Sequence, residues 1–283
     1  GLFIPLIFFY VQESLNIKVR SKEDIDNNTT IPFLSSIGHV NSKTNLEVFA
    51  NPKSAISESF RMLRSNLMYF LNNKEKGIIL ITSSIGGEGK TFSTINLASA
   101  LQISNKKTLI VGADMRKPKI FDDFDLDNSI GLSSVLAGMA KIEDAVRPTG
   151  YDNLFLISAG PIPPNPSELI IEERMKDFIN KVKKDFDYVI IDSPPIALVT
   201  DAFIMGDFVD HTIFVVRQNY TPKVLLNHIE EYYSIGKIKN ISIVLNDIKS
   251  NGGYNYGYGY GYGYGYGYGY GIGKKNGNGY YQT

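Results

Sequence analysis

Residues 77–101 of this 283-residue chain, GIILITSSIGGEGKTFSTINLASAL, are its most informative segment. It begins as a short apolar run, passes through a glycine-rich turn and continues from Lys90 as a helical pattern. The turn matches the phosphate-binding loop G-x-x-x-x-G-K-[ST], except that Ser84 stands at the position of the first glycine. A strand, a glycine-rich loop and a helix in this order predict a nucleotide site.

The loop residues have distinct predicted roles. Glycines let the backbone wrap around phosphate, and the amides of such a loop point at phosphate oxygens. Lys90 is expected to reach the β- and γ-phosphates, and Thr91 to give its hydroxyl to Mg²⁺. The predicted nucleotide-binding residues of the loop are Gly86, Gly87, Glu88, Gly89, Lys90, Thr91 and Phe92.

Further apolar, β-branched runs alternate with helical patterns along the chain, as in a sheet whose strands are buried on both faces. The predicted strands are 77–82, 108–113, 154–158, 188–192, 212–216 and 241–246. The predicted helices are 54–71, 90–103, 167–184, 199–207 and 221–234. We therefore predict a doubly wound, mostly parallel α/β sheet that binds its ligand at the carboxyl ends of the strands.

Two acidic residues follow predicted strand ends. Asp192 closes YVIID before Pro194, and Asp114 follows TLIVGA, with Arg116 two positions later. Beside a phosphate-binding loop, both carboxylates are candidate Mg²⁺ partners together with Thr91. Either aspartate could instead be a turn or cap residue, and Arg116 could neutralise phosphate or pair with Asp122 or Asp123. The predicted catalytic residues are Lys90, Asp114, Arg116 and Asp192.

Bulk composition excludes several classes of function. Lys plus Arg and Asp plus Glu balance at 29 each, so no net charge indicates a nucleic-acid partner. The chain has no cysteine, which excludes disulfides and thiolate chemistry. Its three histidines lack metal-ligand spacing, and His211 lies beside an apolar run, where we expect it at a strand edge.

The flanking segments differ from the α/β region. Residues 1–11, GLFIPLIFFYV, are apolar but too short to span a bilayer alone. They are either a buried element or, as we expect from the basic residues that follow, the end of a transmembrane helix. The polar residues 12–52 are predicted to be a juxtamembrane linker, and residues 53–249 the catalytic domain.

Residues 250–283 hold eleven of the 18 tyrosines, and from Tyr254 to Tyr270 every second residue is tyrosine, with almost only glycine between. Such a repeat cannot build a core and is predicted to be disordered. It could be a simple tether, a cross-β segment or a substrate. Beside an ATP site we favour the substrate. The predicted phosphate acceptors are Tyr254, Tyr256, Tyr258, Tyr260, Tyr262, Tyr264, Tyr266, Tyr268, Tyr270, Tyr280 and Tyr281.

The motifs together resemble the bacterial tyrosine kinases that serve capsule and exopolysaccharide export. SIGGEGKT matches the family's phosphate loop, and VIIDSPP matches its apolar-D-x-x-P motif. IVGADMR matches apolar-D-x-D-x-R, with Gly112 at the position of the first aspartate. GPIPPNPSELI and GLSSVLAG also look like family stretches, and the likeness covers almost the whole chain.

The resemblance implies an ATP- and Mg²⁺-dependent protein-tyrosine autokinase that labels the tail of a neighbouring protomer. Glu58, Arg61 and Arg64 resemble the family's E-x-x-R-x-x-R assembly motif, although such charges also stabilise a lone helix. Asn246 lies where relatives of the fold contact adenine, or is a turn residue. The implied partners are a ring of identical chains, the export machinery and a tyrosine phosphatase, at the cytoplasmic face of the inner membrane.

Two other functions remain open. The chain could be a nucleotide-switched assembly module of the exporter without phosphotransfer, which the missing aspartate at Gly112 favours. It could also resemble the septum-placing and plasmid-partitioning ATPases, which share the fold. Those proteins carry a second lysine early in the loop, where this chain has Ile85.

Overall fold

The computed structural model describes residues 17–42, 44–171, 173–196 and 201–249. These residues form an eight-stranded sheet of order β1-β8-β7-β2-β6-β3-β5-β4, in which only the β4–β5 pairing is antiparallel. The strands are β1 (Phe33–Gly38), β2 (Gly77–Ser83), β3 (Thr108–Gly112), β4 (Arg147–Pro148), β5 (Leu154–Ile157), β6 (Tyr188–Asp192), β7 (His211–Arg217) and β8 (Ile241–Ile248).

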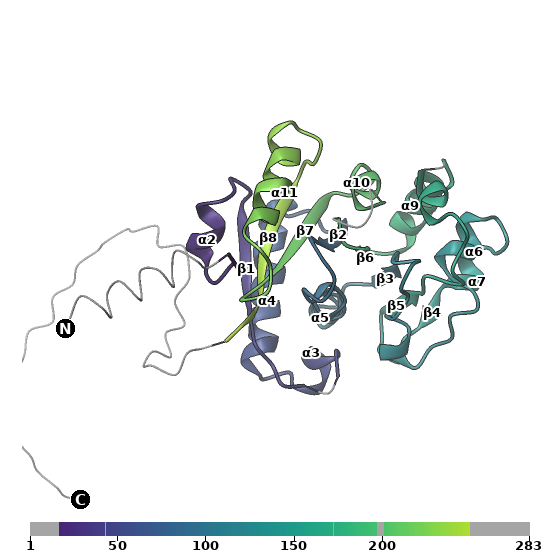
Figure 1. The fold of residues 1–283 in the computed structure, drawn as a ribbon. Coiled ribbons are helices and arrows are strands. Elements are labelled where there is room, and N and C mark those ends of the chain that lie inside the picture. The colour runs from purple at the N-terminus through teal and green to yellow at the C-terminus, as the bar shows by residue number, and fades with distance from the viewer. Residues whose placement is uncertain (1–16, 43, 172, 197–200, 250–283) are drawn as a thin grey trace, which may run out of the picture. The chain divides into compact units, whose positions relative to one another are not determined.

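Helices pack on both faces of this sheet (Figure 1). The first half of the chain supplies α2 (Lys22–Asp26), α3 (Glu47–Ala50), α4 (Ala55–Phe70), α5 (Lys90–Gln102) and a 3₁₀ turn at Asp122–Phe124. The second half supplies α6 (Leu132–Leu136), α7 (Ile142–Ala145), α8 (Pro166–Ile171), α9 (Glu173–Asp185), α10 (Asp201–Gly206) and α11 (Val224–Ser234). The predicted doubly wound, mostly parallel α/β fold is confirmed.

The alternation of side chains along β2 explains why both faces are covered. Ile79 and Ile81 pack into the cluster formed with α4 and α5, whereas Ile78 and Leu80 pack into the cluster formed with α6 and α9. All seven residues of β2 are buried. A strand this apolar is stable only inside a sheet that is covered on both sides. Burying each large aliphatic side chain contributes about 1.5–3 kcal/mol.

The carboxyl ends of the central strands meet at one edge because their registers align. Asp192 of β6 pairs with Ile81 of β2 on one side and with Gly112 of β3 on the other. The loop after β2 and the turn after β3 therefore flank Asp192, as the sheet topology predicts.

The prediction of a linker over residues 12–52 is wrong for residues 17–52. Phe33–Gly38 form strand β1, which pairs in parallel with β8 at the edge of the sheet. Val19 and Ile25 are fully buried against Phe214 of β7 and residues of α11. Burial of these scattered apolar residues makes the segment part of the domain, although its overall composition is polar.

The remaining flanks fall outside the described residues. This applies to the predicted transmembrane end at 1–11 and to the tyrosine-rich segment 250–283. Among the helices that the structure does describe, none combines the length and the apolar character needed to cross a bilayer.

Candidate functional site

The loop between β2 and α5 has a backbone that requires glycine. Gly87 and Gly89 have φ angles of 86° and 95°, in the left-handed region that other residues rarely adopt. A Cβ atom on Gly89 would lie 2.0 Å from Nδ2 of Asn246. Gly89 is also the N-cap of α5, so the helix begins where the loop ends. The positive end of α5 therefore faces the loop, as expected of a phosphate site.

Glu88 braces the loop from inside. Its buried carboxylate accepts hydrogen bonds from the Ile85 amide (2.8 Å), from the Ser84 hydroxyl (2.8 Å) and from the hydroxyl of Thr221. The side chain of this predicted nucleotide-binding residue thus faces the loop interior, and only its backbone can face a phosphate. Ser84, which replaces the first glycine of the motif, uses its hydroxyl for this brace.

Side chains from β7, β8 and the turn after β7 hold the carbonyls of the loop. The Tyr220 hydroxyl donates to Gly86 O (2.8 Å), and a guanidinium NH of Arg217 donates to Gly87 O (3.0 Å). Asn246 Nδ2 donates to Glu88 O (2.9 Å). Sequence reasoning missed Arg217 and Tyr220. The available signal was that Arg217 closes the apolar run TIFVV, which places it at the carboxyl edge of the sheet.

Lys90, Thr91 and Asp192 form one polar cluster, in which Lys90 and Asp192 are buried and Thr91 is half-buried. Thr91 Oγ1 donates to Asp192 Oδ2 (2.8 Å), and Lys90 Nζ donates to Ser83 Oγ (3.1 Å). Burial raises the pKa of Asp192 to about 6, against the opposing effects of the Thr91 hydrogen bond and the Lys90 charge. Burial also lowers the pKa of Lys90, which the nearby carboxylates, Asp192 first, counteract. Such a desolvated cluster is suited to binding a charged ligand.

Asp114 follows β3 and forms a turn. Its Oδ1 accepts the backbone amides of Arg116 (3.2 Å) and Lys117 (3.0 Å). One alternative for Arg116 was an ion pair with Asp122 or Asp123, and that alternative is wrong. It forms an ion pair with Asp201 (3.3 Å) and donates to Ser167 Oγ (2.9 Å).

Two cavities meet at the loop. The first, of about 250 Å³ and here called the cleft, is lined by Gly86, Gly87, Lys90, Thr91, Gly112, Asp114, Arg116, Lys117, Pro118, Lys119, Ile120, Ala159, Asp192, Pro194 and Pro195. The structure thus brings all four predicted catalytic residues to one cavity. A Cβ atom on Gly112 would lie 2.9 Å from Ile120 Cγ2 and 3.2 Å from Ala159 N. The first aspartate of the family motif therefore does not fit here without a shift.

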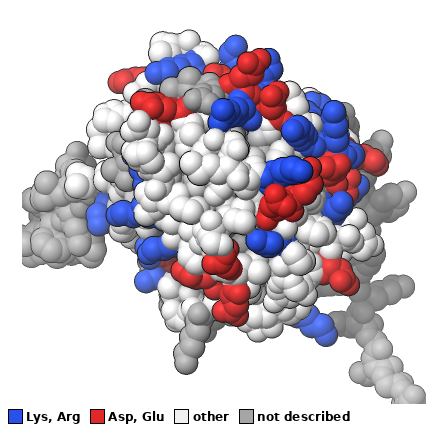
Figure 2. All heavy atoms as spheres, turned by 90° about the vertical axis from the view of Figure 1, so that its right-hand side faces the viewer, with Lys and Arg blue, Asp and Glu red and all other residues white. Residues whose placement is uncertain are grey.

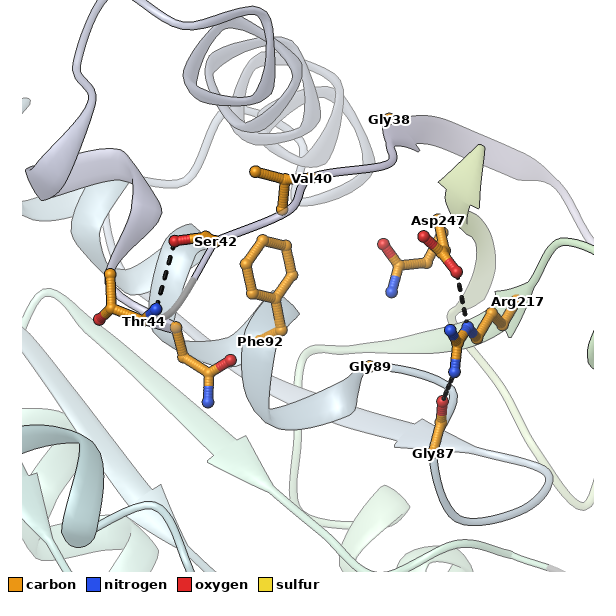
Figure 3. Close-up of a pocket in the computed structure, with 11 residues that line it drawn as sticks. Gly38, Val40, Ser42, Thr44, Gly87, Gly89, Phe92, Arg217 and Asp247 are labelled. Atoms are coloured by element: carbon orange, nitrogen blue, oxygen red, sulfur yellow. Dashed lines mark hydrogen bonds and ion pairs between the residues drawn. The ribbon is translucent and has the colours of Figure 1, made fainter. Parts of the chain in front are cut away.

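The second cavity, of about 200 Å³, is lined in part by Gly87 and Gly89 of the same loop (Figure 3). Phe92 and Asn246 line it together with residues after β1, including Val40 and Ser42. Arg217 also lines it and is bound to Asp247 (2.8 Å) and to Gly87 O (Figure 3). Part of this wall comes from the segment that composition had suggested was a linker.

The donor set fits a Mg²⁺ ion bound together with a nucleotide. Within the described ranges there is no group of three or more acidic or histidine side chains that could hold a metal. Mg²⁺ does not need one, because it is usually bound through one or two carboxylates plus substrate phosphates and water. The buried carboxylate of Asp192, with the Thr91 hydroxyl 2.8 Å away, supplies such a partial set.

The predicted assembly residues lie on α4 and line neither of the two cavities. Arg61 forms an ion pair with Glu58 and donates to Pro52 O (2.6 Å). Arg64 donates to Ala100 O (2.7 Å) and to the hydroxyl of Ser104, at the end of α5. All three make contacts within the chain, and their role in assembly stays a prediction. The predicted acceptor tyrosines lie outside the described residues.

A doubly wound α/β sheet with a braced phosphate loop defines a nucleotide-binding P-loop domain, and an AAA domain family matches residues 76–243. The relatives are more specific. Tyrosine-protein kinase YwqD of Bacillus subtilis is 35% identical over 205 residues, which cover 72% of this chain and 86% of that protein. The chain belongs to the bacterial tyrosine-protein kinase family.

Solved structures agree with this assignment. The chimerical protein CapA2B2 superposes with a TM-score of 0.74 and 36% identity, over 80% of this chain and 98% of that one. The kinase domain of Escherichia coli tyrosine kinase ETK superposes with a TM-score of 0.76 and 26% identity, over 86% and 99%. Tyrosine-protein kinase wzc of Salmonella typhi is 34% identical over 210 residues, but these cover only 27% of that longer protein.

Proposed function

We propose that this chain is an ATP-dependent protein-tyrosine kinase that phosphorylates the tyrosine-rich tail of a neighbouring copy of itself. The observation that carries the proposal is the cleft, in which Lys90, Thr91, Asp114 and Asp192 lie together beside a glycine loop. The sequence supplies a matching acceptor in its repeated tyrosines. The names of the relatives, tyrosine-protein kinases, support the same reaction.

The reaction transfers the γ-phosphoryl group of ATP to a phenol. A bond forms between the tyrosine oxygen and the γ-phosphorus, the bond from that phosphorus to the bridging oxygen breaks, and ADP leaves. Lys90 is positioned to neutralise charge on the β- and γ-phosphates. Asp114 uses Oδ1 for its turn, which leaves Oδ2 to accept the phenol proton. Arg116, fixed by Asp201, lies at the same cleft and adds positive charge.

Thr91 and Asp192 would hold Mg²⁺, which supplies charge neutralisation to the phosphates when bound. Asp192 must be ionised for this role, and the charges of Lys90 and of a bound cation favour that state. The nucleoside is proposed to occupy the second cavity, where Phe92 offers a ring for stacking and Asn246 a polar edge. The two cavities would then hold the two ends of one ATP molecule.

The cellular setting is also a proposal. By resemblance we place the chain at the cytoplasmic face of a bacterial inner membrane, anchored by a preceding transmembrane helix. It would assemble as a ring through Glu58, Arg61 and Arg64 and act on the machinery that exports capsular polysaccharide or exopolysaccharide. A tyrosine phosphatase would reverse the modification.

Purified protein incubated with Mg-ATP and blotted for phosphotyrosine tests the proposal. The parent should be labelled, and Lys90→Met should not. A chain whose eleven tail tyrosines are replaced by serine should lose most of the label. An unlabelled parent would leave the nucleotide-switched assembly module, which the crowded position of Gly112 supports. Rapid ATP hydrolysis without labelling would instead indicate a partitioning-type ATPase.

A further inference from the structure

An open groove lies on the side of the domain that carries α6 and α8, outside the site described above. It has a volume of about 450 Å³, and its wall is mainly apolar, with Met139, Ile162, Pro163, Pro164 and Leu169 among its residues. Met139 and Ile162 are 84% and 65% exposed, unusually high for large apolar side chains. We call this surface the proline groove.

Charged side chains are sparse in the groove. Glu168 is its one ionisable lining residue, and Asn165 Nδ2 donates to its carboxylate (2.9 Å). On the side of the molecule that shows α6, α7 and α9, Lys, Arg, Asp and Glu lie around a broad area that has none (Figure 2). Exposed apolar side chains that gather in one groove, as Met139 and Ile162 do, are typical of an interaction site.

Hydrogen bonds hold the floor of the groove rigid. The Ser133 hydroxyl donates to Pro161 O (2.7 Å), and the Ser133 amide donates to Ala159 O (2.9 Å). Asn128 bonds both the amide (2.8 Å) and the carbonyl (2.9 Å) of Gly160. The segment after β5 is therefore fixed against the start of α6. A preformed surface binds an extended ligand at lower entropic cost.

The groove adjoins the cleft through a shared wall. Ala159 lines the cleft, and Pro161, two residues later, lines the groove. On the opposite side, Ser167 bonds Arg116 and Asp201, and the next residue, Glu168, lines the groove. A chain lying in the groove would thus have neighbouring residues within reach of Asp114 and Lys90.

We propose that the proline groove is the docking site for the tyrosine–glycine repeat, Tyr254–Tyr270, of a second copy of this chain. This proposal rests on the proposed kinase function and names the surface that recognises the acceptor. Aromatic rings pack well on proline rings, and methionine sulfur makes favourable contacts with them. In an extended chain, alternate residues lie on one face, so the repeat can present successive rings to the groove.

The repeat has no carboxylate and, between Tyr254 and Tyr270, no basic residue, so it matches a groove with little charge. The proposed reaction joins two copies of the chain, so the repeat that occupies the groove is that of the second copy.

The low charge of the groove also predicts that a phosphorylated tyrosine is released from it. Each phosphate adds a charge of about −1.5 to −2. The groove lining offers no lysine or arginine to pair with it, and Glu168 repels it. Arg174, which approaches Gly138 at the edge, donates to Leu136 O (2.9 Å). A modified tyrosine should leave, and an unmodified one should take its place.

The test separates docking from phosphotransfer. The donor is the full chain with its eleven tail tyrosines replaced by serine, and the acceptor is the full chain carrying Lys90→Met. The groove variant is a donor that carries both Met139→Ser and Ile162→Ser. Its control is a donor with Ile235→Ser, because Ile235 is 73% exposed and lies at the end of α11. One arm measures acceptor labelling against acceptor concentration. The other measures fluorescence anisotropy of a labelled peptide of residues 252–271 without nucleotide.

We expect the groove variant to raise the acceptor KM and to weaken peptide binding by about tenfold or more, with kcat within about twofold. The Ile235 control should match the parent, and a phosphorylated peptide should bind at least about tenfold more weakly. Unchanged KM and peptide affinity in the groove variant, or a parent that does not bind the peptide, would overturn the proposal. A parent that binds the peptide but labels no acceptor would overturn the kinase function and leave the docking site standing.

Discussion

The hydroxyl of Thr91 donates a 2.8 Å hydrogen bond to Oδ2 of Asp192, although the two residues are 101 positions apart. Thr91 lies on the first turn of α5, directly after the loop, and Asp192 ends β6. The parallel pairing of β2 with β6 sets their separation, because Ile81 is in register with Asp192. The fold alone thus assembles two of the proposed Mg²⁺ ligands.

Replacing Thr91 by valine should remove one of these ligands while keeping the shape of the side chain. Calorimetry with Mg²⁺ and with EDTA measures how much Mg²⁺ raises the affinity for ADP. We expect this increase to be smaller in Thr91→Val than in the parent by a factor of about ten or more. Thr94→Val is the matched control, since Thr94 also contacts Asp192 (3.4 Å) but does not line the cleft. Equal Mg²⁺ effects in the two variants would contradict the assignment.

Sequence reasoning placed the central sheet because its strands are apolar on both faces. It missed β1, whose FLSSIG has two serines at its centre, since pairing with β8 at the sheet edge stabilises this strand more than its own pattern does. It also missed β4, two residues long and ending in Pro148. Such elements depend on contacts with distant segments, which local patterns do not encode.

The residues of the site also divide into those that sequence motifs predict and those that they do not. Lys90, Thr91, Asp114 and Asp192 could be placed from motifs at strand ends. Tyr220 could not, because its contact with Gly86 joins residues 134 positions apart and no local pattern marks it. Position within the loop suggested that Glu88 faces phosphate, whereas a buried carboxylate must find donors, and those lie inside the loop.

The crowded position of Gly112 predicts a measurable coupling with Ile120. Gly112→Ala should destabilise the fold by about 1–3 kcal/mol, because the new Cβ would lie 2.9 Å from Ile120 Cγ2. Ile120→Leu removes that γ-methyl at constant volume, so the cost of Gly112→Ala should fall to about half in this background. Urea unfolding of the four proteins measures the coupling. Strictly additive free energies would show that Ile120 is not the obstacle.

Burial of His211 predicts that stability falls in mild acid. The side chain is buried at the start of β7 with Nε2 2.8 Å from Ser242 Oγ, and burial lowers its pKa to about 4. The unfolded chain therefore takes up a proton near pH 6.5, before the folded chain does. The free energy of unfolding therefore keeps its full value above pH 6.5. It falls by about 3 kcal/mol in all as the pH drops from 6.5 through 4.

Urea unfolding of the parent and of His211→Gln between pH 7 and 4 tests this sign. The variant should lose less stability than the parent over this range, and the difference should grow mainly below pH 6.5. His228→Gln, at an exposed position on α11, is the control and should follow the parent. Parallel curves for the parent and His211→Gln would refute the assignment.

The exposed pair Glu58–Arg61 on α4 separates a local role from a role in assembly. The i,i+3 ion pair contributes only about 0.2–0.5 kcal/mol to its own helix, and the hydrogen bond from Arg61 to Pro52 O about 0.5–1.5 kcal/mol, so Glu58→Ala with Arg61→Ala should lower the free energy of unfolding by at most about 2 kcal/mol. If these side chains bind a neighbouring copy, the same double variant should lower the mass of the assembly in light scattering with Mg-ATP. Lys22→Ala with Asp26→Ala removes a comparable exposed pair on α2 and should keep the parent mass. An unchanged mass in the α4 variant would assign Glu58 and Arg61 to the helix alone, because an interface that loses two charged contacts must weaken.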